Sequence, residues 1–120
     1  MTINKPKYQS VSVRPKVPTL SRVPSEPTIM STISVTLTCT TQSSGTKSYK
    51  FLKDGNIVFA STGDANGIHD NVYTISGVSA SNSGSYSCIV TISAVDSIVS
   101  NSNFITVVGM SLLYSYLYRN

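Results

Sequence analysis

Hydrophobic and polar residues alternate with a period of two along much of the chain after residue 28. In residues 33–39, Ile, Val, Leu and Cys occupy every second position, with Ser or Thr between them. Residues 85–92 show a similar alternation, in which the inward positions are Tyr86, Cys88, Val90 and Ile92. Successive side chains of a β-strand point to opposite faces. Both segments are therefore predicted to be strands with one buried face.

Loop and turn residues separate further short strands. Asp54-Gly55 is a strong hairpin signal, and residues 61–70 consist almost entirely of turn-forming residues. The remaining apolar segments are short and predict four more strands: 49–53, 56–59, 72–75 with Val78, and a last long strand that follows a turn near 94–97 and ends at Val108. Short strands with frequent turn signals are typical of an all-β, two-sheet sandwich, here of about seven strands.

A glycine turn, a tyrosine and a cysteine stand close together in residues 82–88, Asn-Ser-Gly-Ser-Tyr-Ser-Cys. In a sandwich strand, the Tyr86 hydroxyl would hold the corner and Cys88 would face a partner across the core. The chain has two cysteines, so Cys39 and Cys88 permit one disulfide. Closing that loop would stabilise the domain by roughly 3–4 kcal/mol. Whether the two thiols are oxidised depends on the compartment.

These motifs resemble those of the immunoglobulin-like domain over residues 28–108. Cys39 is followed twelve positions later by Phe51, and then by Tyr86-Ser87-Cys88. Residues 51–55 resemble the family's tryptophan strand with its Lys-Asp-Gly-type turn. Two departures stand out, since Phe51 replaces the tryptophan and Asn82 replaces an aspartate that usually pairs with a basic residue. The resemblance implies that Phe51 and Tyr86 are core residues.

Composition divides the chain into three parts. Residues 1–27 contain all five prolines and a net charge of +4, which equals the net charge of the whole chain. Proline removes backbone donors and favours extended geometry, so we expect an extended basic arm there, followed by the sandwich in 28–108. A plain linker or a first edge strand is the alternative for 1–27. Residues 109–120 form a short apolar tail, which either contacts a partner or folds back on the sandwich.

The sequence offers little for catalysis or metal binding. The single histidine, His69, lies in a loop, and no serine sits in a Gly-x-Ser-x-Gly elbow. Two cysteines and one histidine at this spacing cannot form a zinc site. Residues 64–67 with Asp70 resemble a calcium loop only faintly, because the closing glutamate is absent. We therefore expect no enzyme activity, no metal and no cofactor.

The basic arm and the tail carry the functional prediction. The arm has few aromatic residues between its charges, which disfavours nucleic acid, and its prolines prevent a membrane-binding face. No apolar run is long enough to span a membrane. We expect both ends to bind protein, through Lys5, Lys7, Tyr8, Arg14, Lys16 and Arg22 in the arm and through Leu112, Leu113, Tyr114, Tyr116 and Tyr118 in the tail.

An immunoglobulin-like domain with no apolar signal segment and a basic arm resembles the small virion proteins of tailed bacteriophages. This resemblance implies a decoration or auxiliary capsid protein. Such a protein is assembled in the host cytoplasm and binds the major capsid protein, or another virion protein, in many copies per particle. It could also adhere to host-surface carbohydrate. Two alternatives stay open: a cell-surface or secreted adhesion module, and a nucleic-acid-binding packaging accessory.

Overall fold

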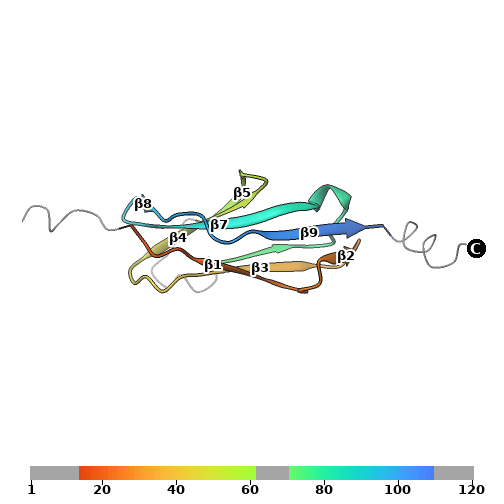
Figure 1. The fold of residues 1–120 in the computed structure, drawn as a ribbon, viewed down its shortest axis with the longest axis horizontal. Helices are drawn as coiled ribbons and strands as arrows, with labels where there is room; N and C mark the ends of the chain where they lie inside the picture. The colour runs from red at the N-terminus through yellow and green to blue at the C-terminus, as the bar shows by residue number, and fades with distance from the viewer. Residues whose placement is uncertain (1–13, 62–70, 110–120) are drawn as a thin grey trace, which may run out of the picture.

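The computed structural model describes residues 14–61 and 71–109, which form two packed β-sheets (Figure 1). The first sheet has the order β1 (Thr19–Val23), β3 (Val35–Thr40), β6 (Val72–Ile75). The second sheet has the order β2 (Thr28–Met30), β9 (Asn103–Val108), β7 (Gly84–Ile92), β4 (Lys47–Lys53), β5 (Asn56–Ala60), and β8 (Val95–Asp96) pairs with β7. The predicted all-β sandwich is confirmed, with nine strands in the described ranges instead of about seven.

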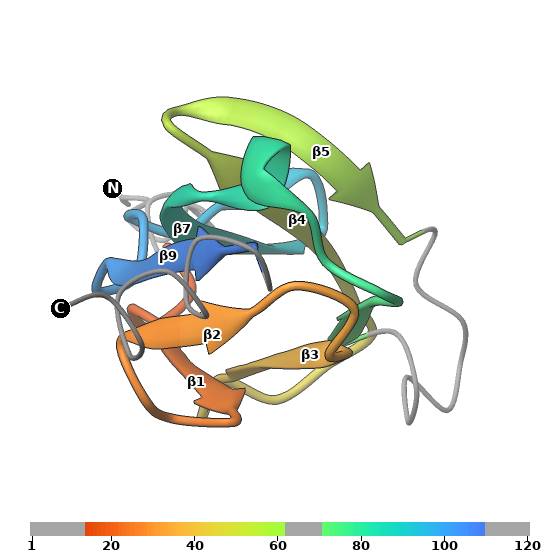
Figure 2. The same ribbon diagram turned by 90° about the vertical axis from the view of Figure 1, so that its right-hand side faces the viewer.

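The core lies between the two layers that Figure 2 shows from one end. Its side chains come from the alternate positions that face inward on each strand, among them Val35 and Leu37 of β3, Val90 of β7 and Ile105 of β9. A disulfide joins Cys39 of β3 to Cys88 of β7 across the core, with Cα atoms 6.2 Å apart. This is the pairing that the two cysteines permit, and it links the middle strands of the two sheets.

Phe51, the residue in the usual tryptophan position, is fully buried beside the bridge. Its ring centroid lies 6.0 Å from that of Phe59 on β5 and 5.6 Å from that of Tyr73 on β6. The Phe59 and Tyr73 rings stack on each other at 5.0 Å. Phe59 and Tyr73 therefore both make aromatic contact with the Phe51 ring. They also connect the edges of the two sheets.

Tyr86 holds the turn that leads into β7. Its side chain is 1% exposed, and its hydroxyl donates a hydrogen bond of 2.6 Å to the backbone carbonyl of Asn82. Burial disfavours the charged phenolate and raises the pKa of Tyr86 to about 12. The Asn82 side chain has a local role, because its Oδ1 accepts a 2.8 Å bond from the Ser79 backbone N–H. That contact closes the 3₁₀ turn η1 (Ala80–Asn82).

The Asp54-Gly55 turn joins β4 to β5 as the sequence predicts. Both residues have positive φ, 52° and 86°, which matches the backbone twist that tight hairpins favour. The Asp54 carboxylate also accepts a 3.0 Å bond from the Ser85 backbone N–H. A Cβ at Gly84 would lie 2.8 Å from that carboxylate. Glycine at position 84 therefore allows the hairpin to close against the start of β7.

The structure corrects the predicted boundary at residue 28. Residues 19–23 form the edge strand β1, which pairs with β3 and buries Leu20, and the prolines at 15 and 18 are buried as well. Only Leu20 of β1 faces the core, so the hydrophobic pattern of this short strand was too weak to outweigh the prolines. The edge-strand alternative describes residues 19–23 correctly. Residues 1–13 lie outside the described residues.

The chain crosses from the first sheet to the second between β1 and β2. Pro24 and Pro27 lie in this crossing, where a missing N–H disrupts no strand pairing. β2 then runs parallel to β9, and its partners are Thr106 to Val108. This three-residue strand contributes only Ile29 to the core, so its period-two signal is too short to read from sequence.

The predicted last strand is interrupted. After β8, residues 97–102 run beside β7 without regular pairing. The Ser97 and Ser100 hydroxyls accept bonds of 3.0 Å and 2.9 Å from the backbone N–H groups of Val90 and Cys88. These two buried hydroxyls take the place of backbone carbonyls, which keeps the N–H groups of β7 satisfied. β9 therefore begins only at Asn103.

Candidate interaction surface

The second sheet presents an apolar outer face, defined here as Leu52, Ile57, Ile89 and Phe104. On β4, β7 and β9 at least one chain neighbour of each of these residues is buried, so by strand alternation Leu52, Ile89 and Phe104 point away from the core. Ile57 pairs with Leu52 across the β4–β5 hairpin and therefore lies on the same face. Phe104 is 63% exposed and Ile57 57% exposed. These two side chains are available to a partner.

Small hydroxyl residues and one ion pair surround these apolar side chains. Ser85 pairs with Phe104, and Ser87 with Leu52, so both serines belong to the same surface. Lys50 Nζ lies 3.1 Å from a carboxylate oxygen of Asp96. The surface is therefore poor in unpaired charge, as the cores of protein interfaces are.

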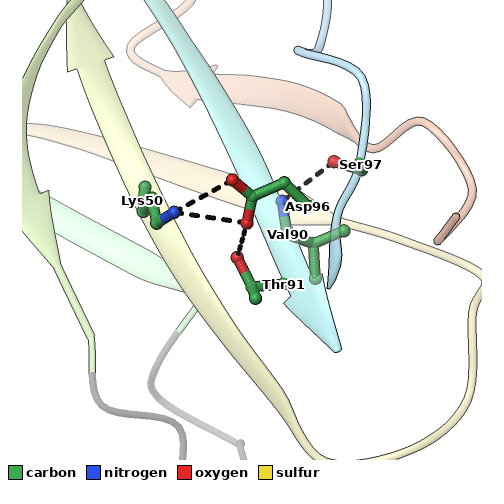
Figure 3. Close-up of polar contacts among 5 residues, drawn as sticks. All are labelled: Lys50, Val90, Thr91, Asp96 and Ser97. Atoms are coloured by element: carbon green, nitrogen blue, oxygen red, sulfur yellow. Dashed lines mark hydrogen bonds and ion pairs between the residues drawn. The ribbon is translucent and has the colours of Figure 1, made fainter. Parts of the chain in front are cut away.

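Figure 3 shows how the ion pair is held at the β7–β8 turn. The Lys50 ammonium donates to both Asp96 oxygens, at 3.2 Å and 3.1 Å, and the Thr91 hydroxyl donates to Oδ1 at 2.6 Å. The hydrogen bond from Thr91, followed by that from Lys50, lowers the pKa of the Asp96 carboxyl below its ordinary value of 3.8. Asp96 therefore stays ionised and neutralises Lys50 at physiological pH.

Sequence reasoning missed this outer face, although signals for it exist. In residues 103–107 the buried positions are Ile105 and Val107, so strict alternation places the large apolar Phe104 on the opposite side. Ile57 follows the hairpin turn in an edge strand whose five residues are all exposed. A large apolar residue on the predicted solvent side of a strand is the signal that would have found the surface.

The structure separates the predicted arm residues. Arg14 and Lys16 are exposed at the entry to the first sheet. Arg22 is used inside the domain instead: its guanidinium donates to Asn103 Oδ1 at 3.0 Å and to the carbonyls of Pro24 and Glu26 at 2.8 Å and 2.6 Å. Arg22 therefore stabilises the crossing between the sheets, and its role in partner binding stays a prediction. Outside the described residues lie Lys5, Lys7, Tyr8, Leu112, Leu113, Tyr114, Tyr116 and Tyr118.

Metal and membrane features are absent from the part of the chain that the structure describes. Within residues 14–61 and 71–109, no group of three His, Cys, Asp or Glu side chains could hold a metal ion. In the same ranges, no helix is long and apolar enough to cross a membrane. The loop compared above with a calcium site, and His69 with it, lies in residues 62–70, outside the described residues.

The family model described as "Immunoglobulin domain" matches residues 17–107. The chain belongs to the immunoglobulin domain family. This match includes β1 and begins eleven residues before the boundary that the sequence predicted. No curated protein sequence is significantly similar to this immunoglobulin domain.

Several solved structures have folds similar to this domain. The second Ig-C2 domain of human Fc-receptor like A is 27% identical, with a TM-score of 0.58, and the match covers 76% of this chain and 95% of that one. CHIR-AB1 is 18% identical with a TM-score of 0.62, over 77% and 98%. Murine CEACAM1b is 19% identical with a TM-score of 0.64, over 79% and 46%. The immunoglobulin domain thus spans about half of the CEACAM1b chain.

These comparisons correct the predicted function. The expectation of a bacteriophage decoration protein on a capsid is wrong, because the structural neighbours are immunoglobulin-like proteins such as the second Ig-C2 domain of human Fc-receptor like A. The phage inference depended on combining an immunoglobulin-like domain with a separate basic arm. Half of that arm, residues 14–27, lies within the described domain and contains β1. Residues 14–27 are therefore not a separate arm, as the comparison with a virion protein required.

Proposed function

We propose that this immunoglobulin domain is a non-catalytic recognition module of a cell-surface or secreted protein, and that it binds a protein partner through the outer face of its second sheet. Two exposed apolar side chains, Ile57 on β5 and Phe104 on β9, lie on a face with little unpaired charge and support this proposal most directly. Single exposed apolar residues are normal, but several on one face of a sheet are typical of an interaction site.

The energetics of the outer face favour a protein partner. Aromatic residues are enriched at the centres of protein interfaces, and covering an exposed Phe or Ile is worth roughly 1.5–3 kcal/mol. Lys50 and Asp96 already neutralise each other, so a partner would not have to bury an unpaired charge. The surrounding serine hydroxyls can form hydrogen bonds at the rim.

The buried disulfide between Cys39 and Cys88 is consistent with a cell-surface or secreted protein. Disulfides persist in oxidising compartments, which include the secretory pathway and the cell surface. The similar receptors give a precedent for protein binding. A further neighbour is a chain in the crystal structure of a mouse coronavirus receptor-binding domain complexed with its murine receptor. It is 20% identical with a TM-score of 0.63, and the match covers 79% of this chain and 46% of that one.

The test is binding of the tetramerised domain to a panel of cells, measured by flow cytometry, together with sedimentation velocity to detect self-association. We expect saturable binding to some cells, or self-association, that the double variant Ile57→Arg/Phe104→Arg abolishes. The matched control is Val23→Arg, because Val23 is 70% exposed but lies on β1 of the other sheet. Binding that survives the double variant, or no binding in either assay, would contradict the proposal.

A further inference from the structure

A pocket of about 320 Å³ lies at the end of the sandwich where the chain enters β1. The residues that line it come from the entry segment 14–16, from the β3–β4 loop and from the end of β7: Arg14, Pro15, Lys16, Gln42, Ser43, Ser44 and Ile92. It is separate from the outer face, whose apolar residues do not line it. Its volume is at the lower end of the range for small-molecule sites, about 300–1,000 Å³.

The walls of the pocket are fixed to each other. The Lys16 backbone N–H donates a 2.7 Å bond to Ser43 Oγ, and the Thr41 hydroxyl donates a 3.3 Å bond to the Lys16 carbonyl. Pro15 is buried between two exposed cationic residues. This anchoring presents Arg14 and Lys16 on the exposed side of one extended segment.

The lining is rich in donors and has no acid among its described residues. Neither the Arg14 guanidinium nor the Lys16 ammonium takes part in an ion pair or side-chain hydrogen bond in the described part of the chain. The carboxylate of Asp96 is near enough for Arg14 to affect it, but Lys50 and Thr91 already occupy its oxygens (Figure 3). Two positive charges therefore remain available to a ligand.

Neutral groups complete the site. Ser43 Oγ accepts from the Lys16 backbone, so its own proton is free to donate. Ser44 and the Gln42 amide add further hydrogen-bonding groups, whereas Ile92 and Pro15 provide apolar surface. An oxyanion next to several hydroxyls and a C–H face is the chemistry that matches this set.

We propose that this pocket binds a monosaccharide unit that carries a carboxylate or a sulfate. Arg14 and Lys16 bind the oxyanion, Gln42, Ser43 and Ser44 bind ring hydroxyls, and Ile92 contacts the apolar face of the sugar. Carboxylated and sulfated sugars share this chemistry, so separate probes must distinguish them. The inference is independent of the outer face and of any protein partner.

The experiment is an NMR titration of the ¹⁵N-labelled full chain at low ionic strength with four probes: glucuronate, galactose 6-sulfate, glucose and sodium sulfate. We expect at least one acidic sugar to shift the amides of residues 41–46 and 92 saturably, with a Kd of about 1 mM, a typical value for a weak single site. Glucose should cause no saturable shift. Added salt should weaken binding, because exposed charges are screened.

Variants assign the binding to the two cations. Lys16→Gln should weaken the affinity about tenfold, and Arg14→Gln/Lys16→Gln should remove saturable binding. Lys53→Gln is the control with the same charge change, because Lys53 lies far from the pocket. Lys47 pairs with the pocket residue Ile92, and Lys53 lies six residues further along β4, about 20 Å away. The affinity of Lys53→Gln for the acidic sugar should stay within about twofold of that of the parent domain. Melting temperatures confirm that each variant is folded.

Three outcomes would overturn the proposal. The first is the absence of any saturable shift with both acidic sugars. The second is an equal response to sodium sulfate, which would mean an oxyanion site without sugar recognition. The third is an equal loss of affinity in Lys53→Gln, which would mean nonspecific attraction to a basic protein. A response to glucuronate alone or to galactose 6-sulfate alone supports the proposal and identifies the acidic group.

Discussion

The two ends of the sandwich use similar residues for opposite purposes. At the corner end, Tyr86 and Arg22 direct their polar groups to backbone carbonyls of the same domain. At the pocket end, Arg14 and Lys16 come from the same N-terminal segment as Arg22. They are exposed and make no side-chain hydrogen bond within the described chain. A polar group that is satisfied internally stabilises the fold, whereas an exposed and unpaired one is available to a ligand.

This contrast shows why charge alone does not separate the exposed cations from the one that the fold uses. Arg14 and Arg22 are eight positions apart and look equivalent in the sequence. Arg22 contacts the start of β9, including the Phe104 carbonyl at 3.3 Å, which is 82 residues away in the chain.

The largest expected effect is alkaline destabilisation at the corner end. The pKa of Tyr86 rises from 10.0 to about 12 on folding, so the folded state holds the phenolic proton more tightly than the unfolded state. The resulting stability is fully present below pH 10 and is lost as pH rises through 12. Urea unfolding between pH 10 and 12 should show a loss on the order of 2 kcal/mol. Tyr86→Phe should lack this component, and an unchanged pH dependence in that variant would contradict the account.

Tyr86→Phe should also destabilise the domain at pH 7. The substitution leaves the Asn82 carbonyl without its 2.6 Å hydrogen bond, at a cost of about 1–3 kcal/mol in chemical denaturation. Tyr73→Phe is the matched control, because no hydrogen bond of the Tyr73 hydroxyl is found among the described residues. It should change the free energy of unfolding by less than about 0.5 kcal/mol. Equal effects would show that the corner bond has no special role.

Two arginine substitutions compare the ends directly. Arg22→Gln removes bonds to the crossing segment and should cost about 1–2 kcal/mol in the same assay. Arg14→Gln should stay within about 0.5 kcal/mol of the parent, because its side chain supports no described contact. If the two variants are equally stable, the distinction between the ends is wrong.

The smallest effect concerns the ion pair at the pocket end. The pKa of Asp96 is below 3.8 in the folded state, so its contribution is present at higher pH and is lost as pH falls through the folded pKa. Both partners are partly exposed, so the loss in acid should be only about 0.5 kcal/mol. Lys50→Gln should remove part of this component when unfolding is followed from pH 5 to pH 2. A much larger loss would mean that the pair is structural.

The sequence predicted the strands whose hydrophobic pattern is strong. The alternation in β3 and β7, the Asp54-Gly55 hairpin and the Tyr86 corner all depend on local signals, and each is present in the structure. β1 was predicted only as an alternative, and β2 was missed, because each buries only one large apolar side chain, Leu20 or Ile29. Their stability comes from pairing with distant strands, which no local window contains.

The candidate site was harder to predict than the fold. The pocket joins residues 14–16, 42–44 and 92. These meet only because β1 pairs with β3 and the end of β7 pairs with the start of β4, beside the β3–β4 loop. The outer face likewise requires the registers of four strands. The predicted function failed for a related reason, since it treated residues 1–27 as one arm although half of them belong to the described domain.

The central claim is that binding through the outer face is separate from stability at the corner end. The most direct test measures cell binding and melting temperature on the same preparations of Ile57→Arg/Phe104→Arg and Arg22→Gln. The account predicts that the outer-face variant loses cell binding and keeps its melting temperature. It predicts that Arg22→Gln has a lower melting temperature but still binds cells at temperatures where it is folded. Binding retained by the outer-face variant while it remains folded would contradict the claim.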